Sequence, residues 1–166
     1  MTKWLAVIGS RKVSDAMRAD IERDVLAALA DGWSIVSGGS TGADFEAART
    51  VDGAGLAGTR LRLYLPIAAD AYIAGFRARV QAGKADGNDT EAMIELLQKL
   101  RIEAPNCIHD TTKFTTLSSA SFHARNDQIV VCADCLLAYR LGRSLGTDAT
   151  IAKARQHAIP LNIHNY

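Results

Sequence analysis

The segment from residue 35 to residue 49 combines a short apolar strand, a glycine-rich turn and the start of a helix. Gly38, Gly39 and Gly42 allow positive φ in this turn and leave room for a ligand to approach the backbone. The first N–H groups of the following helix have no partner inside the helix, so the turn can hold an anion. Many turns in α/β proteins are equally rich in glycine and bind nothing. The turn therefore favours an α/β fold and leaves phosphate binding open.

Strand-like and helix-like segments alternate over most of the chain. Residues 4–8 form an uninterrupted apolar run, which is typical of a strand buried on both faces of a parallel sheet. Ser14 is a suitable N-cap for a helix that extends to about Ala30 and carries apolar residues at four-residue spacing. Residues 33–37 form the second strand, and the alternation of residues 60–65 predicts an edge strand. Further elements are predicted as a helix at 121–131, a strand at 134–139, a helix at about 149–157 and a strand at 159–163.

Residues 67–116 depart from this alternation and are predicted to be a less regular helical insert within a single domain that spans residues 1–166. The insert can cover a site as a lid, pair two subunits or simply pack against the core, and the sequence does not choose among these roles. Its segments are a helix at 70–81, a polar loop at 83–89 and an amphipathic helix at 90–101.

The second helix of the insert has an apolar stripe, and Met93, Leu96, Leu97 and Leu100 are expected to face inward from it. Because this stripe lies outside the regular alternation, it also provides a basis for self-association. We therefore predict a homodimer or a larger assembly.

Composition limits the classes of function. The chain has 166 residues, of which 48% are hydrophobic and 22% charged, as expected of one globular domain with a substantial core. The formal net charge of +1 is no general basic footprint, so nucleic acid is a possible partner but not the favoured one. No apolar run approaches the ~20 residues of a membrane span, and the first residues lead directly into a strand. We expect a cytoplasmic protein without a membrane partner.

Three cysteines do not indicate a disulfide scaffold. Cys132 and Cys135 have Cys-x-x-Cys spacing, but a structural zinc site needs two further ligands. Free cysteines are often small buried hydrophobic residues. We predict no metal site and no cofactor.

The order of the strands predicts where a ligand binds. In a doubly wound sheet the first strand is central, so residues 4–8 are expected to lie beside residues 134–139 across the switch point. The turns at 9–11 and 142–148 then face one crevice, and the turn at 38–43 enters it from the other side. The fold is predicted to be a three-layer α/β/α Rossmann-like, doubly wound, mostly parallel sheet. The convergence of three turns favours a ligand that carries phosphate.

Two common nucleotide motifs are absent. The first turn lacks G-x-G-x-x-G, and the second strand ends in glycines rather than an acidic residue that could bind a ribose. No G-x-x-x-x-G-K-[ST] occurs either. A standard nicotinamide dehydrogenase and a P-loop nucleoside triphosphatase are therefore disfavoured.

Four motifs together resemble one superfamily. In chain order they are Ile8-Gly9-Ser10-Arg11, Ser37-Gly38-Gly39-Ser40-Thr41-Gly42-Ala43-Asp44, Ala124-Arg125-Asn126 and Leu145-Gly146-Thr147. They resemble the SLOG superfamily, which includes the Smf-type DNA-processing proteins, the Lonely guy phosphoribohydrolases, molybdenum-cofactor carriers and nucleotide-sensing domains. The resemblance is greatest to the DNA-processing branch. For that branch it implies a pocket for phosphate or nucleotide and single-stranded DNA binding by the full proteins.

The resemblance to the phosphoribohydrolases is incomplete. Arg125 matches the arginine of their Arg-Lys pair, but Asn126 stands in place of the lysine. Thr150 stands where the family has a glutamate, so no clear catalytic carboxylate is present to stabilise an oxocarbenium-like transition state or to activate water. We therefore leave open whether the protein is an enzyme, and we expect little or no release of free base from nucleoside monophosphates.

The predicted function is binding of a nucleotide or related phosphorylated small molecule in the strand-end crevice, as a sensor, carrier or presenting domain. The alternatives are a nucleoside-monophosphate phosphoribohydrolase and a protein that binds single-stranded DNA. Arg11 is expected to grip phosphate rather than form a surface salt bridge, Arg125 either binds the ligand or ties two helices together, and Asp44 is a helix cap. The predicted ligand-binding residues are Gly9, Ser10, Arg11, Gly38, Gly39, Ser40, Thr41, Gly42, Asp44, Arg125, Asn126, Gly142, Gly146 and Thr147.

Overall fold

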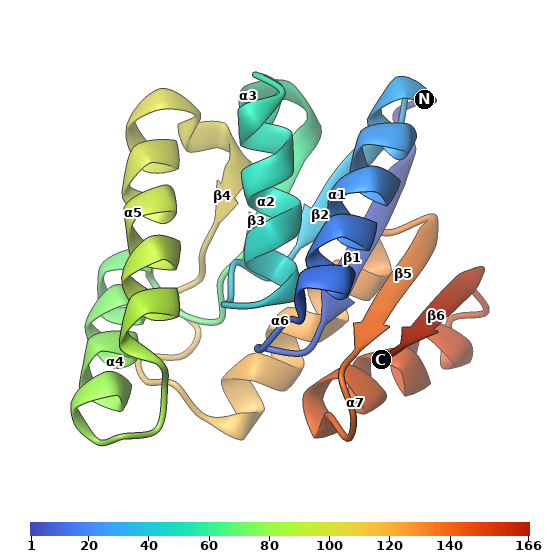
Figure 1. Cartoon of the computed structure of the whole chain (residues 1–166). Coiled ribbons are helices and arrows are strands. Elements are labelled where there is room, and N and C mark those ends of the chain that lie inside the picture. Colours follow the sequence, from blue (N-terminus) through green and yellow to red (C-terminus); the bar gives the residue numbers. More distant parts are fainter.

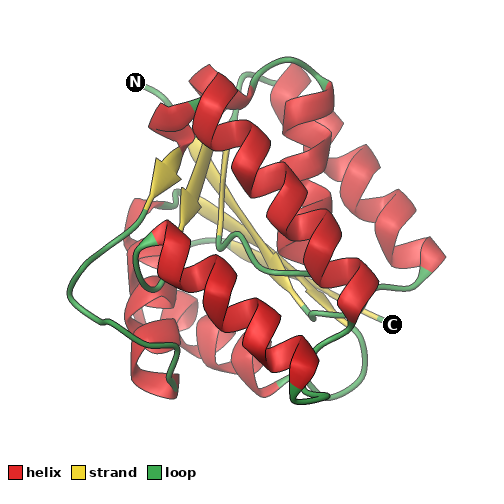
Figure 2. Ribbon diagram, turned by 90° about the vertical axis from the view of Figure 1, so that its left-hand side faces the viewer, coloured by secondary structure: helices red, strands yellow, loops and turns green.

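The computed structural model describes all 166 residues and has three layers, with a sheet between two layers of helices (Figures 1 and 2). All strand pairs are parallel, and the sheet order is β4-β3-β2-β1-β5-β6. This confirms the predicted α/β Rossmann-like architecture. The strands are β1 (Trp4–Gly9), β2 (Ser34–Ser37), β3 (Leu61–Tyr64), β4 (Ile108–His109), β5 (Cys135–Arg140) and β6 (Leu161–Asn165).

Seven α-helices and one short 3₁₀ helix cover the sheet. Apolar residues of α1, α2, α4 and α5 belong to the larger core cluster, whereas those of α6 and α7 belong to a second cluster on the other face. The helices are α1 (Asp15–Ala30), α2 (Ala43–Gly53), α3 (Ala57–Arg60), α4 (Ala69–Gln81), α5 (Gly87–Glu103), α6 (Ser119–Cys132) and α7 (Leu145–Gln156), with η1 at Pro105–Cys107.

Strand β1 is the centre of the fold. It pairs with β2 on one side and with β5 on the other, as the doubly wound topology predicts. Leu5 and Val7 lie in the larger core cluster and Ala6 and Ile8 in the smaller one, so successive side chains fill opposite faces. This double burial explains why the sequence of β1 is an uninterrupted apolar run.

The first helix begins where the sequence predicts. The Ser14 hydroxyl accepts a hydrogen bond from the Met17 N–H at 3.2 Å, and α1 ends at Ala30. One face of the helix buries Met17, Ile21, Val25 and Leu29 against the sheet.

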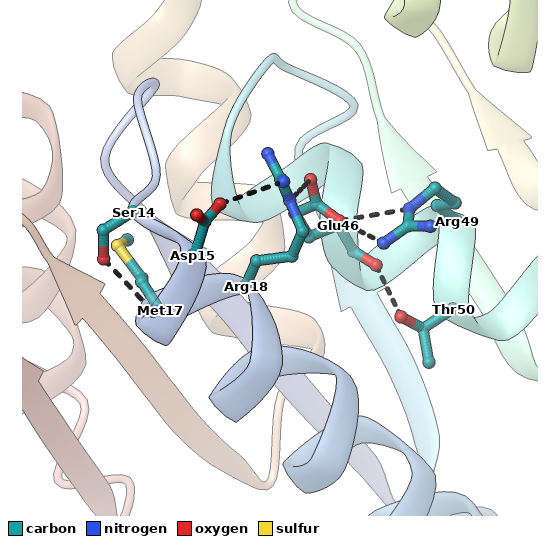
Figure 3. Close-up of polar contacts among 7 residues, drawn as sticks. All are labelled: Ser14, Asp15, Met17, Arg18, Glu46, Arg49 and Thr50. Carbon is teal, nitrogen blue, oxygen red and sulfur yellow. Dashed lines mark hydrogen bonds and ion pairs between the residues drawn. The ribbon is translucent and has the colours of Figure 1, made fainter.

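An ion cluster joins α1 to α2 (Figure 3). Glu46 of α2 is 4% exposed, and its carboxylate pairs with Arg18 of α1 at 2.9 Å and with Arg49 at 2.7 Å. Thr50 donates a hydrogen bond to the Glu46 carbonyl oxygen at 2.8 Å. We refer to Arg18, Glu46 and Arg49 as the seam.

Strand β3 is not an edge strand, which corrects the prediction for residues 60–65. The two-residue strand β4 pairs with its outer side, at Leu63–Ile108 and Tyr64–His109. The alternation arises because Leu61 and Leu63 are buried in the larger core, whereas Arg62 and Tyr64 are half-buried on the opposite face. Alternation therefore reports one incompletely covered face and not the end of a sheet.

The helices of the insert pack against the domain core. Met93 and Leu97 are each 2% exposed and Leu100 is fully buried within the larger core cluster, while Leu96 is half-buried. The inward orientation is confirmed, but the stripe is wrong as a basis for self-association, since the chain's own core already covers it. The homodimer stays a prediction without this support.

The polar loop in the insert is shorter than predicted. Helix α5 begins at Gly87 because the Asp86 carboxylate accepts a hydrogen bond from the Asp89 N–H at 2.9 Å.

None of the helices has the length and apolar character that crossing a membrane requires.

Candidate functional site

A cleft of about 590 Å³ opens at the carboxyl ends of β1 and β5. Its walls come from the turn after β1, the glycine-rich turn before α2, helix α6 and the turn that leads into α7. This is where ligands bind in open parallel sheets. Of the predicted residues, the cleft brings together Gly9, Ser10, Arg11, Ser40, Asp44, Arg125, Asn126, Gly146 and Thr147.

The other predicted residues do not line the cleft and instead shape the turns around it. A Cβ on Gly38 would lie 2.3 Å from Nη1 of Arg125, and one on Gly39 would lie 2.7 Å from Leu65. The remaining three residues of this group are Thr41, Gly42 and Gly142.

Two glycines let the turns approach one another closely. Gly42 has φ +78°, and a Cβ there would lie 2.2 Å from the Ser10 carbonyl oxygen. A Cβ on Gly9 would lie 2.3 Å from the carbonyl oxygen of Tyr139 in β5. Any side chain at either position would separate the first turn from its neighbours.

Ser10 joins the turns that form the cleft. Its N–H donates to the Tyr139 carbonyl oxygen at 2.9 Å, and its own carbonyl oxygen accepts from the Ala43 N–H at 3.1 Å. Its hydroxyl oxygen accepts from the Leu141 N–H at 2.9 Å. Ser10 therefore links the ends of β1 and β5 to the start of α2.

The start of α2 has no side-chain cap, so the prediction that Asp44 is a helix cap is wrong. Gly42 is the N-cap residue, and no side chain accepts a hydrogen bond there. Asp44 lies inside the helix, where its carboxylate reaches back to the N–H of Ser40 at 3.3 Å. Asp44 therefore stabilises the glycine-rich turn itself.

Asp44 is a buried acid, with 7% of its surface exposed. Desolvation raises the pKa of its carboxyl group, while the positive charge of Arg125 and the hydrogen bond from Ser40 oppose this shift. It is the only carboxylate among the residues that line the cleft.

Helix α7 begins four residues earlier than predicted, at Leu145 instead of Ala149. Ser144 is its N-cap residue but makes no capping bond, because its hydroxyl is paired with the Thr147 hydroxyl at 2.8 Å. Gly146 and Thr147 are in the first helical turn and line the cleft. A helix start without a side-chain cap leaves its N–H groups available to an anion.

Arg125 holds the site together. It is 6% exposed, and its guanidinium donates to the carbonyl oxygens of Gly38 and of Tyr64, the latter at 3.3 Å, while Nε donates to Asn126 at 2.9 Å. Arg125 therefore ties α6 to the glycine-rich turn and to the end of β3.

Arg11 differs from Arg125, because it is exposed and makes no ion pair or hydrogen bond within the protein. Its guanidinium lies 5.0 Å from the centre of the Phe122 ring, and the Arg125 guanidinium lies 5.5 Å from the same ring. The alternative role in a surface salt bridge is therefore wrong.

Several residues that line the cleft were not predicted from the sequence. Lys12 and Arg143 are exposed cations without an ion-pair partner, so the lining carries four cationic side chains and one carboxylate. Phe122 could have been identified from its place one turn before Arg125 on the same helix. The full set of additional lining residues is Ile8, Lys12, Phe122, Ile129, Leu141, Arg143, Ser144 and Thr150.

One polar group of the lining has no partner. The Ser40 side chain is buried with 4% exposure, and its hydroxyl oxygen makes no hydrogen bond. This oxygen has almost no exposed surface, so it becomes available to a ligand in the cleft only when the side chain rotates toward it.

Thr150, at the position where the resemblance to the phosphoribohydrolases implies a glutamate, carries a hydroxyl group and no carboxyl group. The Thr150 hydroxyl donates to the Gly146 carbonyl oxygen at 3.0 Å within α7. The nearby Asp148 does not line the cleft and pairs with Arg140 at 2.7 Å. No group of three or more His, Cys, Asp or Glu residues is arranged to hold a metal ion.

Comparisons with known proteins support the fold. No protein-family profile matches the chain, and no curated protein matches it in sequence. The structure of DNA processing protein A from Helicobacter pylori matches this chain with a TM-score of 0.71 at 18% identity. That structure was reported for the single-stranded DNA binding mode of its protein. The match covers 97% of this chain and 64% of that protein, so this chain spans less than two thirds of its length.

Two further structures have the same architecture. The molybdenum cofactor binding protein from Rippkaea orientalis has a TM-score of 0.60 at 15% identity, over 100% of this chain and 78% of that one. DNA processing protein A from Streptococcus pneumoniae has a TM-score of 0.55 at 15% identity. The match covers 98% of this chain and 58% of that protein. The chain therefore shares its fold with DNA-processing and molybdenum-cofactor-binding proteins, as the resemblance to the SLOG superfamily implied.

Proposed function

We propose that the cleft binds a nucleotide or a related phosphorylated small molecule. The observation that carries this proposal is the charge of the lining, where Arg11, Lys12 and Arg143 have no acidic partner. Cations in a concave site attract an anionic ligand, and arginine can bind phosphate through two hydrogen bonds. The volume of about 590 Å³ is within the range of small-molecule sites.

The neutral donors of the cleft suit phosphate oxygens. Ser40 can offer a hydroxyl once its side chain rotates toward the cleft, and the first turn of α7 offers N–H groups near Gly146 and Thr147. A phosphate placed between them would accept hydrogen bonds from both elements and interact favourably with the helix dipole. Such a domain would sense, carry or present its ligand.

A panel of nucleotides tests the proposal. Nucleoside monophosphates, nucleoside diphosphates and ADP-ribose should each be added at millimolar concentration while the melting temperature is measured. A compound present at 100 times its dissociation constant should add about 2.7 kcal/mol to the free energy of unfolding. If no phosphorylated compound in the panel raises the melting temperature, the proposal is wrong.

Single-stranded DNA is a second candidate ligand. The structural likeness to DNA processing protein A from Helicobacter pylori over 97% of this chain favours it, as does the cationic lining. Binding to several phosphates of a DNA strand would weaken steeply with salt, whereas a small nucleotide releases few counterions. Affinity for a short oligonucleotide at several salt concentrations separates the two ligands.

Hydrolysis of a nucleotide is the least supported function. Asp44 is the only carboxylate in the lining, and it is engaged with the Ser40 N–H. We expect the rate at which free base is released from AMP, GMP or cytokinin monophosphates to be far below the turnover numbers of ~1–10³ s⁻¹ that are typical of enzymes. Turnover at ordinary rates, lost in an Arg125→Ala variant that remains folded, would establish the hydrolase instead.

A further inference from the structure

The two edges of the sheet differ in how well they are protected from pairing with another chain. Strand β4 forms one edge and has only 2 residues, whereas β6 forms the other and has 5 (Figure 1). An edge strand as short as β4 offers almost no length for pairing, so its size protects it. Strand β6 is long enough to pair, and none of its residues is fully buried.

The outer side of β6 carries a row of main-chain groups that the sheet does not use. The Tyr166 N–H donates to the Arg140 carbonyl oxygen of β5 at 3.0 Å. Alternate residues of a strand direct their main-chain groups to opposite sides, so the even-numbered residues of β6 bond to β5. The N–H and carbonyl groups that point away from the sheet belong to Leu161, Ile163 and Asn165.

The devices that usually prevent edge pairing are absent from β6. Its sequence, Leu-Asn-Ile-His-Asn, contains no proline and no Lys, Arg, Asp or Glu. Its residues pair one to one with β5 from Leu161 to Asn165, so no bulge twists the edge away. The formal net charge of +1 adds little repulsion between copies of the chain. The edge is therefore open to pairing with another strand.

We propose that β6 pairs with β6 of a second copy of this chain, in antiparallel orientation about a twofold axis at Ile163. In this register Ile163 faces its own counterpart, and Leu161 faces Asn165 of the second copy. The half-buried Ile163 side chains then lose contact with water. The two sheets become one, and the assembly stops at a dimer because the remaining edges are β4 strands.

A second copy suits this edge better than an extended peptide does. A peptide must lose main-chain entropy to become a strand, whereas β6 is already ordered by its pairing with β5. On one face of the sheet Leu161 and Ile163 pack against the smaller core cluster, and the twofold pairing continues this apolar surface into the second copy. Because β6 carries no acidic or basic side chain of fixed charge, no like charges meet.

Hydrogen exchange at two protein concentrations tests the interface without a mutation. An interface centred on one short strand is small, so we expect a dimer that dissociates at low-micromolar concentration. The amides of Leu161, Ile163 and Asn165 should exchange at least about tenfold more slowly at near-millimolar concentration, because dissociation exposes them to water. The amides of Asn162 and His164 point toward β5 and should be protected at both concentrations.

Light scattering with matched variants tests the same interface by mass. At near-millimolar concentration the parent should have about twice the 17.8 kDa mass of one chain. Ile163→Lys places two positive charges face to face and should restore the mass of one chain. Ile102→Lys is the matched control and should leave the dimer intact, since Ile102 is 82% exposed on α5, at the opposite end of the sheet (Figure 1).

Ile163→Pro separates the edge from the packing of the side chain. Proline at this position removes an N–H that points outward and leaves the bonds to β5 in place, so the variant should fold and be monomeric. Circular dichroism and thermal melting establish that each variant is folded.

The outcomes decide the proposal in each case. A parent that remains monomeric at near-millimolar concentration, or whose outward amides exchange rapidly there, overturns the proposal and leaves the edge to a different partner. A dimer that persists in folded Ile163→Lys and Ile163→Pro variants uses another surface and also overturns it. If neither variant folds, the amide exchange of the parent decides.

Discussion

Helix α2 carries two buried acids in opposite electrostatic settings. Glu46 lies in the seam, where two arginines approach its carboxylate at 2.9 and 2.7 Å. Asp44, two residues earlier, faces a cleft whose exposed cations Arg11, Lys12 and Arg143 make no ion pair. The seam satisfies its charges within the chain, whereas the cleft does not.

This difference separates structural charge from charge available to a ligand. An arginine that pairs with a buried carboxylate contributes to stability, and its removal should not affect binding. An arginine without a protein partner contributes little to stability, and its removal should affect binding alone. Arg125 combines both roles, because it lines the cleft and also donates to two backbone carbonyl groups.

The largest expected effect is on stability, in Arg125→Ala. The variant should lose about 3 kcal/mol of unfolding free energy, because the buried carbonyl group of Gly38 and the half-buried one of Tyr64 lose a charged donor. Urea denaturation measures the loss. Arg155→Ala is the control, since Arg155 is exposed on α7; an equally small effect in both variants would refute the structural role of Arg125.

Arg11→Ala should affect binding and not stability. We expect the free energy of nucleotide binding to weaken by about 1.5–3 kcal/mol, the range for hydrogen bonds to charged groups. The unfolding free energy should stay within about 0.5 kcal/mol of the parent. Calorimetry gives the first value and urea denaturation the second; unchanged affinity would remove Arg11 from the site.

Glu46→Gln should give the reverse pattern in the seam. The variant should lose about 1 kcal/mol of unfolding free energy, because both arginine side chains are nearly half exposed and water screens their attraction. Salt should reduce the difference between variant and parent. Nucleotide affinity should be unchanged, and a clear loss of affinity would show that the seam and the cleft are coupled.

The smallest expected effect is the pH dependence caused by Asp44. Because burial raises the pKa of this carboxyl group in the folded protein, folding favours its protonated form. Its contribution to stability is therefore fully present below the ordinary aspartate pKa of about 3.9 and is lost as pH rises through the higher folded pKa. The stability of the parent relative to Asp44→Asn should fall over this interval, and a rise would contradict the account.

The fold could be predicted where burial leaves a clear pattern in the sequence. Strand β1 is apolar on both faces, which indicated a strand buried on both sides, and its central place followed from the doubly wound order of strands. Strand β4 has only two residues, Ile108 and His109, which is too short for any periodicity to be visible. Because β4 was not predicted, nothing corrected the interpretation of the alternation in residues 60–65 as an edge strand.

The site could be predicted only in part, because sequence locates turns better than it locates partners. Three turns were expected to converge, and residues from all three line the cleft. The sequence could not indicate that Arg125 binds carbonyl groups far away in the chain, or that Asp44 bonds backward to Ser40. Such contacts depend on how α6 and α2 approach the same turn.

The most direct test of the central claim is a crystal structure with the nucleotide that raises the melting temperature most. The account predicts a phosphate within hydrogen-bonding distance of the Ser40 hydroxyl and of N–H groups in the first turn of α7, with Arg11 turned toward the ligand. A nucleotide bound outside the cleft, with Ser40 and Arg11 still without partners, would contradict it.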